Sequence, residues 1–326
     1  MTTLALALVA ATGAGAAVWR WPVGLAIAAS RARLSFTGLR RHSRRGRFGT
    51  EVWWSGGGGP VLVLIHGMND QAGSWARVAG RLTRAWHVVV PDLAGHGASG
   101  PTAGRLGLDT ILDALDDLLA HVAPDRPFTL VGNSMGAWMT QLVALRRPDR
   151  VARVVLECGG GLSFGDSAPD LLPSTRDEAR HFFVRVLGPH ARPLPGFVLD
   201  HVVRRLRSCP LRRVLDTDWT RHHVDDLVGD WAVPTDVIWG DADGVLPIGY
   251  ARRLVSALPG ARLHVIPGAA HLPHRDRPGQ FLATLGRLLE SPPEVTAGRR
   301  LGHAPRPFAP REVTRPDPGD SPHAAR

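Results

Sequence analysis

Short apolar runs alternate with longer amphipathic segments along most of this 326-residue chain. The run Val61–Ile65, for example, follows the turn signal Gly56–Pro60. Its residues are aliphatic without interruption, which is typical of a strand buried on both faces. Similar runs predict six further strands at Glu51–Trp54, Val88–Val90, Thr129–Val131, Val154–Leu156, Val237–Trp239 and Leu263–Ile266.

Amphipathic segments lie between these runs, and their apolar residues recur at spacings of three and four, the period of one helix face. Strands that alternate with helices form mostly parallel sheets. We therefore expect an α/β fold, a mostly parallel sheet with helices on both faces, over residues 50–290. The predicted helices are Trp75–Thr83, Leu108–His121, Ala137–Arg146, Ile248–Leu258 and Gln280–Leu289.

Two regions break this alternation. Residues 159–231 contain no β-branched run, and the arginine-rich segments Arg176–Leu187 and Phe197–Leu206 favour helices. We interpret this region as a helical cap inserted into the domain. Residues 291–326 are rich in proline and arginine without periodicity, which predicts a disordered tail.

The net charge of +10 suggests nucleic-acid binding until its distribution is considered. Residues 1–50 contain eight arginines and no acidic residue, and the tail contributes six arginines against four acidic residues. The remaining 25 arginines and 25 acidic residues of the body cancel. Because a neutral body offers no basic footprint, we expect no nucleic-acid partner.

The first 45 residues combine apolar runs with a basic flank. The runs Leu4–Val18 and Val23–Ala29 reach the length of a membrane-spanning helix only when joined, and Trp19 and Trp21 suit a membrane interface. All eight arginines follow the first run, which favours a membrane anchor with the folded domain in the cytoplasm. The alternative is a signal peptide, cleaved near the small residues at 14–16, of a secreted protein.

The segment Leu130–Gly136 combines a strand, a tight turn and the start of a helix, with G-x-S-x-G at the turn. Glycines on both sides of Ser134 permit a strained turn that lifts the serine oxygen out of the backbone. The helix N-terminus behind it favours developing negative charge. This context predicts Ser134 as a nucleophile, whereas the alternative is a plain glycine-rich turn.

A serine nucleophile needs a histidine base, oriented in turn by a carboxylate, and in proteins with this turn both follow the serine. His271 follows the strand at Leu263–Ile266, and His274 lies three residues farther along. Asp241 and Asp243 both follow the preceding strand, so either carboxylate could serve. We predict His271 as the general base.

Backbone N–H groups must stabilise the oxyanion that forms when the serine attacks a carbonyl. The N–H of Met135, directly after Ser134, is one predicted donor. The second is the N–H of Met68, because His66-Gly67 lets the chain turn sharply after a strand. Alternatively, His66-Gly67 merely ends that strand.

Metal and cofactor sites are not indicated. The two cysteines, Cys158 and Cys209, fit no zinc spacing, and no H-E-x-x-H pattern occurs. We therefore predict neither a metal nor a cofactor.

These motifs together resemble the α/β-hydrolase superfamily over about residues 60–290. The resemblance is carried by His66-Gly67, the segment Pro91–Ser99, the Ser134 turn, Trp239–Asp243 and His271. In that family the second aspartate of the W-G-x-x-D type segment carries the acid role, which favours Asp243 over Asp241. The resemblance implies a triad of Ser134, His271 and Asp243.

Gly-Asn-Ser-Met-Gly and an N-terminal anchor resemble membrane-associated lipases and monoacylglycerol lipases. That resemblance implies hydrolysis of a small carboxylic ester or lipid through an acyl-enzyme. Hydrolysis of a C–C or amide bond on the same triad is an alternative, and a non-catalytic binding protein of the same fold is another, because the fold alone does not determine the reaction.

Overall fold

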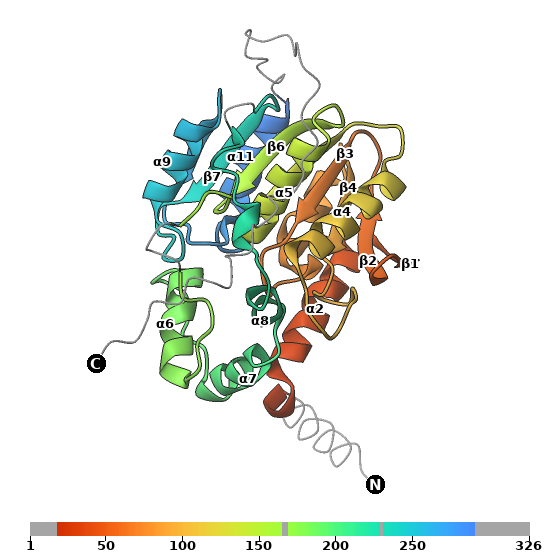
Figure 1. The fold of residues 1–326 in the computed structure, drawn as a ribbon. Helices are drawn as coiled ribbons and strands as arrows, with labels where there is room; N and C mark the ends of the chain where they lie inside the picture. Colours follow the sequence, from red (N-terminus) through yellow and green to blue (C-terminus); the bar gives the residue numbers. More distant parts are fainter. Residues whose placement is uncertain (1–17, 165–168, 229–230, 291–326) are drawn as a thin grey trace, which may run out of the picture.

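An eight-stranded sheet crosses the molecule in the computed structural model, which describes residues 18–164, 169–228 and 231–290 (Figure 1). The strand order is β1-β2-β4-β3-β5-β6-β7-β8. Pairing is antiparallel between β1 and β2 and between β2 and β4, and parallel elsewhere. The predicted α/β fold is confirmed. The strands are β1 (Arg40–Gly46), β2 (Gly49–Gly56), β3 (Val61–Ile65), β4 (His87–Asp92), β5 (Phe128–Asn133), β6 (Val151–Glu157), β7 (Thr235–Gly240) and β8 (Arg262–Ile266).

Alternate residues of the central strands enter two separate cores. In β3, Val61, Val63 and Ile65 pack into one core, whereas Leu62 and Leu64 pack into the other. All five side chains are buried. A sheet covered on both faces therefore explains why the strand sequences are apolar without alternation.

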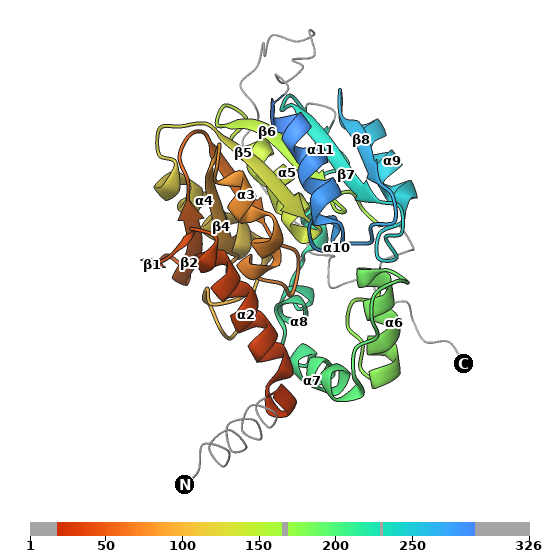
Figure 2. The same ribbon diagram turned by 180° about the vertical axis from the view of Figure 1, so that it is seen from behind.

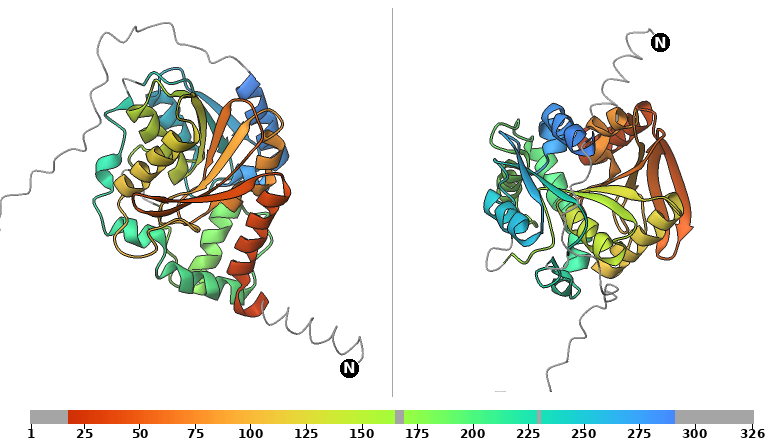
Figure 3. Two further views of the ribbon diagram at one scale, coloured as in Figure 1. Left: turned by 90° about the vertical axis from the view of Figure 1, so that its right-hand side faces the viewer. Right: turned by 90° about the horizontal axis from the view of Figure 1, so that it is seen from above.

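Helices cover each face of the sheet, as the views from behind and from above show (Figures 2 and 3). One face carries α4 (Leu108–Val122), α5 (Met135–Arg146) and α9 (Ile248–Ala257). The opposite face carries α3 (Ala79–Leu82) and α11 (Pro278–Glu290), together with the 3-10 helix η1 (Ala72–Arg77). The single helix predicted at Trp75–Thr83 is thus replaced by η1 and the short α3.

The sheet begins earlier than the predicted domain boundary at residue 50. Strand β1, with the sequence RRHSRRG, pairs with β2 along its whole length and forms the edge of the sheet. Its side chains are exposed or half-buried, so it carries no apolar pattern that sequence reasoning could detect. Charged side chains are typical of an edge strand.

Helix α2 (Pro22–Phe36) packs against η1 and β1, and it also contacts α7 (Gly196–Leu206). Leu34 is fully buried in the core, and the guanidinium of Arg31 forms a 2.9 Å ion pair with the buried carboxylate of Asp92. Among the residues that the structure describes, no helix has the length and apolarity required to span a bilayer. The predicted apolar run Leu4–Val18 lies almost entirely outside these residues, as does the predicted tail.

The chain between β6 and β7 forms short helices that gather at one end of the sheet (Figure 1). The predicted helices Arg176–Leu187 and Phe197–Leu206 correspond to α6 (Arg176–Leu187) and α7 (Gly196–Leu206). They are followed by α8 (Pro210–Leu215) and the 3-10 helix η2 (Thr220–His222).

Candidate active site

Ser134 occupies the turn between β5 and α5 in a backbone conformation that few residues other than glycine adopt. Its φ is 55° and its ψ is −120°. The serine N–H donates to the carbonyl of Glu157 at 2.9 Å, and the serine carbonyl accepts from Ala137 N–H at 3.0 Å. Such strain persists only where the surroundings impose it, and it is common at functional sites.

Glycines surround Ser134 because the backbone segments approach closely there. A Cβ on Gly132 would collide with the carbonyl of Gly136, and a Cβ on Gly159 would collide with the Ser134 backbone. A Cβ on Gly67 would lie 3.0 Å from the Cβ of Ser134. These glycines place the chain after β3 and the chain after β6 directly against the serine.

His271 and Asp243 form a buried hydrogen-bonded pair. Asp243 Oδ2 lies 2.9 Å from His271 Nδ1, and Asp243 Oδ1 accepts hydrogen bonds from the N–H groups of Val245 and Leu246. The Asp243 side chain is fully buried. A carboxylate held in this way keeps the histidine proton on Nδ1 and leaves Nε2 available as a base.

The neighbouring candidates from the sequence have other partners. Asp241 is exposed, and its Oδ1 accepts a hydrogen bond from Gly268 N–H at 2.7 Å, as expected of a turn-forming carboxylate. His274 is fully buried, with its Nδ1 2.8 Å from Glu157 Oε2. The structure thus pairs His271 with Asp243 rather than with Asp241.

The loop after β3 is fixed by His66 and Asn69. His66 Nε2 accepts from Leu93 N–H at 3.0 Å, so the ring proton lies on Nδ1 and is donated to the carbonyl of Gly67 at 2.8 Å. Asn69 has a φ of 59° and accepts a hydrogen bond from Leu211 N–H at the start of α8. Met68 lies between these anchors, half-buried, next to the segment that approaches Ser134.

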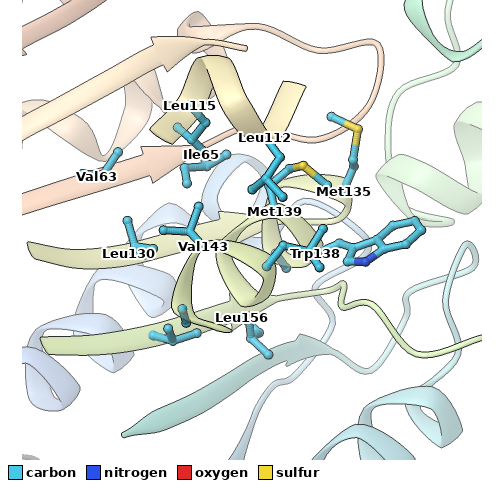
Figure 4. Packing of buried hydrophobic residues seen from close by; sticks show 14 of the residues in the cluster. Val63, Ile65, Leu112, Leu115, Leu130, Met135, Trp138, Met139, Val143 and Leu156 are labelled. Carbon is cyan, nitrogen blue, oxygen red and sulfur yellow. The ribbon is translucent and has the colours of Figure 1, made fainter. Parts of the chain in front are cut away.

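The helix behind Ser134 is held by a dense apolar core (Figure 4). Met135, Trp138 and Met139 of α5 are buried against residues of β3 and α4 such as Ile65 and Leu112. The N–H of Met135, at the first position of α5, has no acceptor within its own helix because helices leave their first N–H groups unpaired. Both predicted oxyanion donors therefore belong to segments that adjoin Ser134.

The helices inserted between β6 and β7 contact the site from several directions. The N–H of His271 donates to the carbonyl of Val186 and that of Gly244 to the carbonyl of Arg185, both at 3.2 Å and both at the end of α6. The indole N–H of Trp138 donates to the carbonyl of His222 at 2.9 Å. Ser134 itself is half-buried.

Two residues at the site were not found by sequence reasoning. Asn133 donates from Nδ2 to the carbonyl of His271 at 3.0 Å, which ties the serine turn to the histidine loop. Glu157, at the end of β6, accepts the Ser134 N–H through its backbone. Its position, a carboxylate at the C-terminal end of a parallel strand, is the signal that could have identified it.

Comparison with known proteins agrees with this geometry. A family model described as "Alpha/beta hydrolase family" matches residues 62–285. The pimeloyl-[acyl-carrier protein] methyl ester esterase of Chromobacterium violaceum is 30% identical, over 72% of this chain and 96% of that protein. A monoacylglycerol lipase of Xenopus laevis is 25% identical, over 72% of this chain and 77% of that protein.

Solved structures share the fold. A crystal structure of a membrane phospholipase A, described as a bacterial virulence factor, has a TM-score of 0.69 and 23% identity, covering 89% of this chain and 100% of that chain. A lipase-related structure from Acinetobacter baumannii also has a TM-score of 0.69, with 20% identity over 80% of this chain and 94% of that chain. The chain therefore belongs to the alpha/beta hydrolase family and is a hydrolase.

Proposed function

We propose that this chain hydrolyses carboxylic esters through a triad of Ser134, His271 and Asp243. The observation that carries the proposal is the 2.9 Å pairing of His271 with a buried Asp243. The pair lies at the carboxyl ends of the strands, as does Ser134, whose φ is 55°. A strained serine, whose turn is hydrogen-bonded through Asn133 to the loop of an oriented imidazole, fits the arrangement that acyl transfer requires.

In the proposed reaction, Nε2 of His271 removes the proton of Ser134 as its oxygen attacks the ester carbonyl. The N–H groups of Met135 and Met68 stabilise the oxyanion, and the positive end of α5 contributes to the same effect. His271 then protonates the departing alcohol. Water, deprotonated by His271, hydrolyses the acyl-enzyme and regenerates Ser134.

An ester or lipid substrate is supported by the relatives. One of them is named as a methyl ester esterase and another as a monoacylglycerol lipase, and the alignment covers most of the length of each. Because α/β hydrolases share one triad among several reactions, the ester class is inferred from these relatives rather than from the fold.

The helices α6–α8 fit the role of a cap over the substrate site. The cluster formed by Leu206, Cys209 and Leu211 packs against Met68. Two carbonyl groups at the end of α6 accept hydrogen bonds from the backbone N–H groups of Gly244 and His271. We propose that this segment shapes the acyl or alcohol pocket. It would also restrict water around Ser134, which strengthens electrostatic interactions there.

Membrane association is supported by exposed apolar side chains just before and at the start of α2. Val18, Trp19, Trp21 and Leu25 are between 41% and 69% exposed, which is unusual for four large apolar side chains within eight residues. Burial lowers the pKa of His201 in α7, and the positive charges of Arg204, Arg205 and Arg20 lower it further. Basic groups therefore gather close to this exposed apolar segment. A cytoplasmic position of the domain stays a prediction, as does the alternative of secretion.

The test is hydrolysis of p-nitrophenyl esters of increasing acyl length by the full-length chain, with Ser134→Ala in parallel. We expect the wild-type protein to hydrolyse these esters and the substitution to abolish hydrolysis. The acyl length that is hydrolysed fastest would indicate the length of the acyl pocket. Hydrolysis that survives the substitution would contradict the proposal. If Ser134 reacts with a fluorophosphonate but the protein hydrolyses no ester, hydrolysis of a C–C or amide bond becomes the favoured function.

A further inference from the structure

A second serine–histidine–carboxylate array lies buried behind the site. Ser74 Oγ is 2.9 Å from His274 Nε2, and His274 Nδ1 is 2.8 Å from Glu157 Oε2. The His274 and Glu157 side chains are fully buried, and Ser74 is 5% exposed. The proposed mechanism uses none of these three groups.

The array has no access to substrate, so its function must be exerted through its neighbours. The indole of Trp75 stacks on the His274 ring at 4.0 Å, and Phe281 packs against the edge of the same ring at 6.1 Å. Two aromatic groups thus enclose the imidazole. A nucleophile sealed in this way cannot attack an external ester.

Each member of the array belongs to a different segment of the proposed machinery. Glu157 accepts the N–H of Ser134 through its carbonyl, so its backbone position sets that of the nucleophile. His274 lies three residues after His271, in the short helix α10 (Pro273–Asp276) (Figure 2). Ser74 lies in η1, directly after the loop that carries Met68.

Glu157 binds His274 through three hydrogen-bond contacts. Its Oε1 accepts the backbone N–H of His274 at 2.8 Å and lies 3.0 Å from Nδ1, while Oε2 lies 2.8 Å from Nδ1. A carboxylate is an acceptor only, so Nδ1 carries the proton. A buried carboxylate that is hydrogen-bonded in this way resists displacement, because losing the imidazole would leave a buried charge without compensation.

We infer that Glu157, His274 and Ser74 are positioning residues that lock the nucleophile turn, the His271 loop and the Met68 loop into one geometry. This inference rests on the proposed function. A displacement of about 1 Å in such a constellation lowers rates by roughly a hundredfold, so the lock is expected to act on kcat more than on KM.

The test compares variants of the full-length protein that cut the array at different points. Glu157→Gln removes the charge, Ser74→Ala removes the η1 link, and His274→Asn keeps an amide nitrogen in the place of Nδ1. Phe281→Leu is the matched control, because Phe281 contacts the His274 ring without a hydrogen bond. The measurements are kcat, KM, Tm and the second-order rate of fluorophosphonate labelling, with rates expressed per labelled site.

Glu157→Gln is expected to lower kcat and the labelling rate by about 10- to 100-fold with KM within about threefold. Ser74→Ala and His274→Asn, which each keep part of the array, are expected to lower both by about three- to tenfold. Phe281→Leu is expected to lower Tm while keeping kcat. If Glu157→Gln does not fold, the outcome for Ser74→Ala decides.

Variants of the array that lose Tm but keep kcat and the labelling rate, as the control does, would overturn the inference. Failure of the proposed function is a separate result: the wild-type protein itself would then hydrolyse no ester, whether or not a serine is labelled. An active wild type with unaffected Ser74→Ala and Glu157→Gln variants refutes the positioning role alone.

Discussion

The imidazole of His271 is oriented by Asp243 across 2.9 Å, and this carboxylate is held in turn by two backbone N–H groups on its other oxygen. The pair comes from the loops after β7 and β8, whereas Ser134 follows β5. Parallel strands bring the three loops to one edge of the sheet.

Asp243→Asn is expected to lower kcat for ester hydrolysis by about 10⁴-fold, on the precedent of the same substitution in serine proteases. The asparagine oxygen can keep the bonds to Val245 and Leu246 N–H, which turns the amide NH₂ toward His271. That donor forces the histidine proton onto Nε2, where it blocks base catalysis. Steady-state kinetics at neutral pH measures the effect.

Asp241→Asn is the matched control for that prediction. Its side-chain oxygen can still accept the Gly268 N–H, so kcat is expected to stay within about threefold of the wild type, as for a surface site remote from the reacting atoms. A larger loss for Asp241→Asn than for Asp243→Asn would reverse the assignment of the acid.

Gly159→Ala is expected to lower both stability and activity. The added Cβ meets the Ser134 backbone rather than a flexible side chain, so the serine turn must shift. We expect a loss of about 1–3 kcal/mol in the free energy of unfolding and at least a tenfold loss in kcat. Urea denaturation and ester kinetics provide the two readings.

Gly286→Ala in α11 offers the opposite case, because among the described residues no atom outside the neighbouring backbone of the helix lies within 4 Å of the added Cβ. It is expected to raise the free energy of unfolding by about 0.5–1 kcal/mol through helix propensity, with unchanged kcat. Equal behaviour of the two alanine variants would mean that the close packing around Ser134 is not required.

His96 is expected to make the fold acid-sensitive. Burial, followed by the neighbouring His66, lowers the pKa of His96 to about 3, below its ordinary value of 6.5. Between these values the unfolded chain binds a proton that the folded chain does not, so stability is complete above about pH 6.5 and falls as the pH drops toward 3. The free energy of unfolding then falls by up to roughly 1.4 kcal/mol for each pH unit.

His96→Asn removes that titration while offering an amide donor to the Ala94 carbonyl, which His96 Nδ1 contacts at 3.0 Å. Urea unfolding at pH values of about 7, 6 and 5 should show a shallower decline for the variant than for the wild type. His222 and His223, whose pKa values burial also lowers, account for part of the remaining slope. Parallel curves for the two proteins would refute the contribution of His96.

Trp19→Ser with Trp21→Ser is expected to reduce binding to anionic liposomes at least severalfold, since aromatic side chains anchor proteins at membrane interfaces. The two tryptophans are 69% and 56% exposed. Phe36→Ser is the matched control: Phe36 is 90% exposed at the C-terminal end of α2, whereas the two tryptophans precede that helix. Liposome sedimentation measures binding, and a loss in the control equal to that of the double variant would contradict this surface.

The central strands and the serine turn could be predicted from sequence because their patterns are local. Five consecutive aliphatic residues identify β3, and G-x-S-x-G between a strand and a helix identifies Ser134. The choice of Asp243 over Asp241 needed a family resemblance, since both follow β7 and only the structure shows which one meets His271.

Other features depend on contacts between distant segments. Strand β1 has no apolar face and exists because its backbone pairs with β2. The predicted N-terminal segment, residues 1–45, also contributes to the folded domain, because Leu34 of α2 is buried in the core and Arg31 forms an ion pair with the buried Asp92. The pairing of Glu157 with His274 joins residues 117 positions apart, which no local pattern reveals.

The nucleophile is identified most directly by labelling the full-length protein with a fluorophosphonate and locating the modified residue by peptide mass spectrometry. We predict a single adduct on Ser134, formed at a rate that His271→Ala lowers by orders of magnitude because the base is lost. An adduct on another serine, or no adduct in a protein that nevertheless hydrolyses esters, would contradict the assignment of Ser134 as the nucleophile.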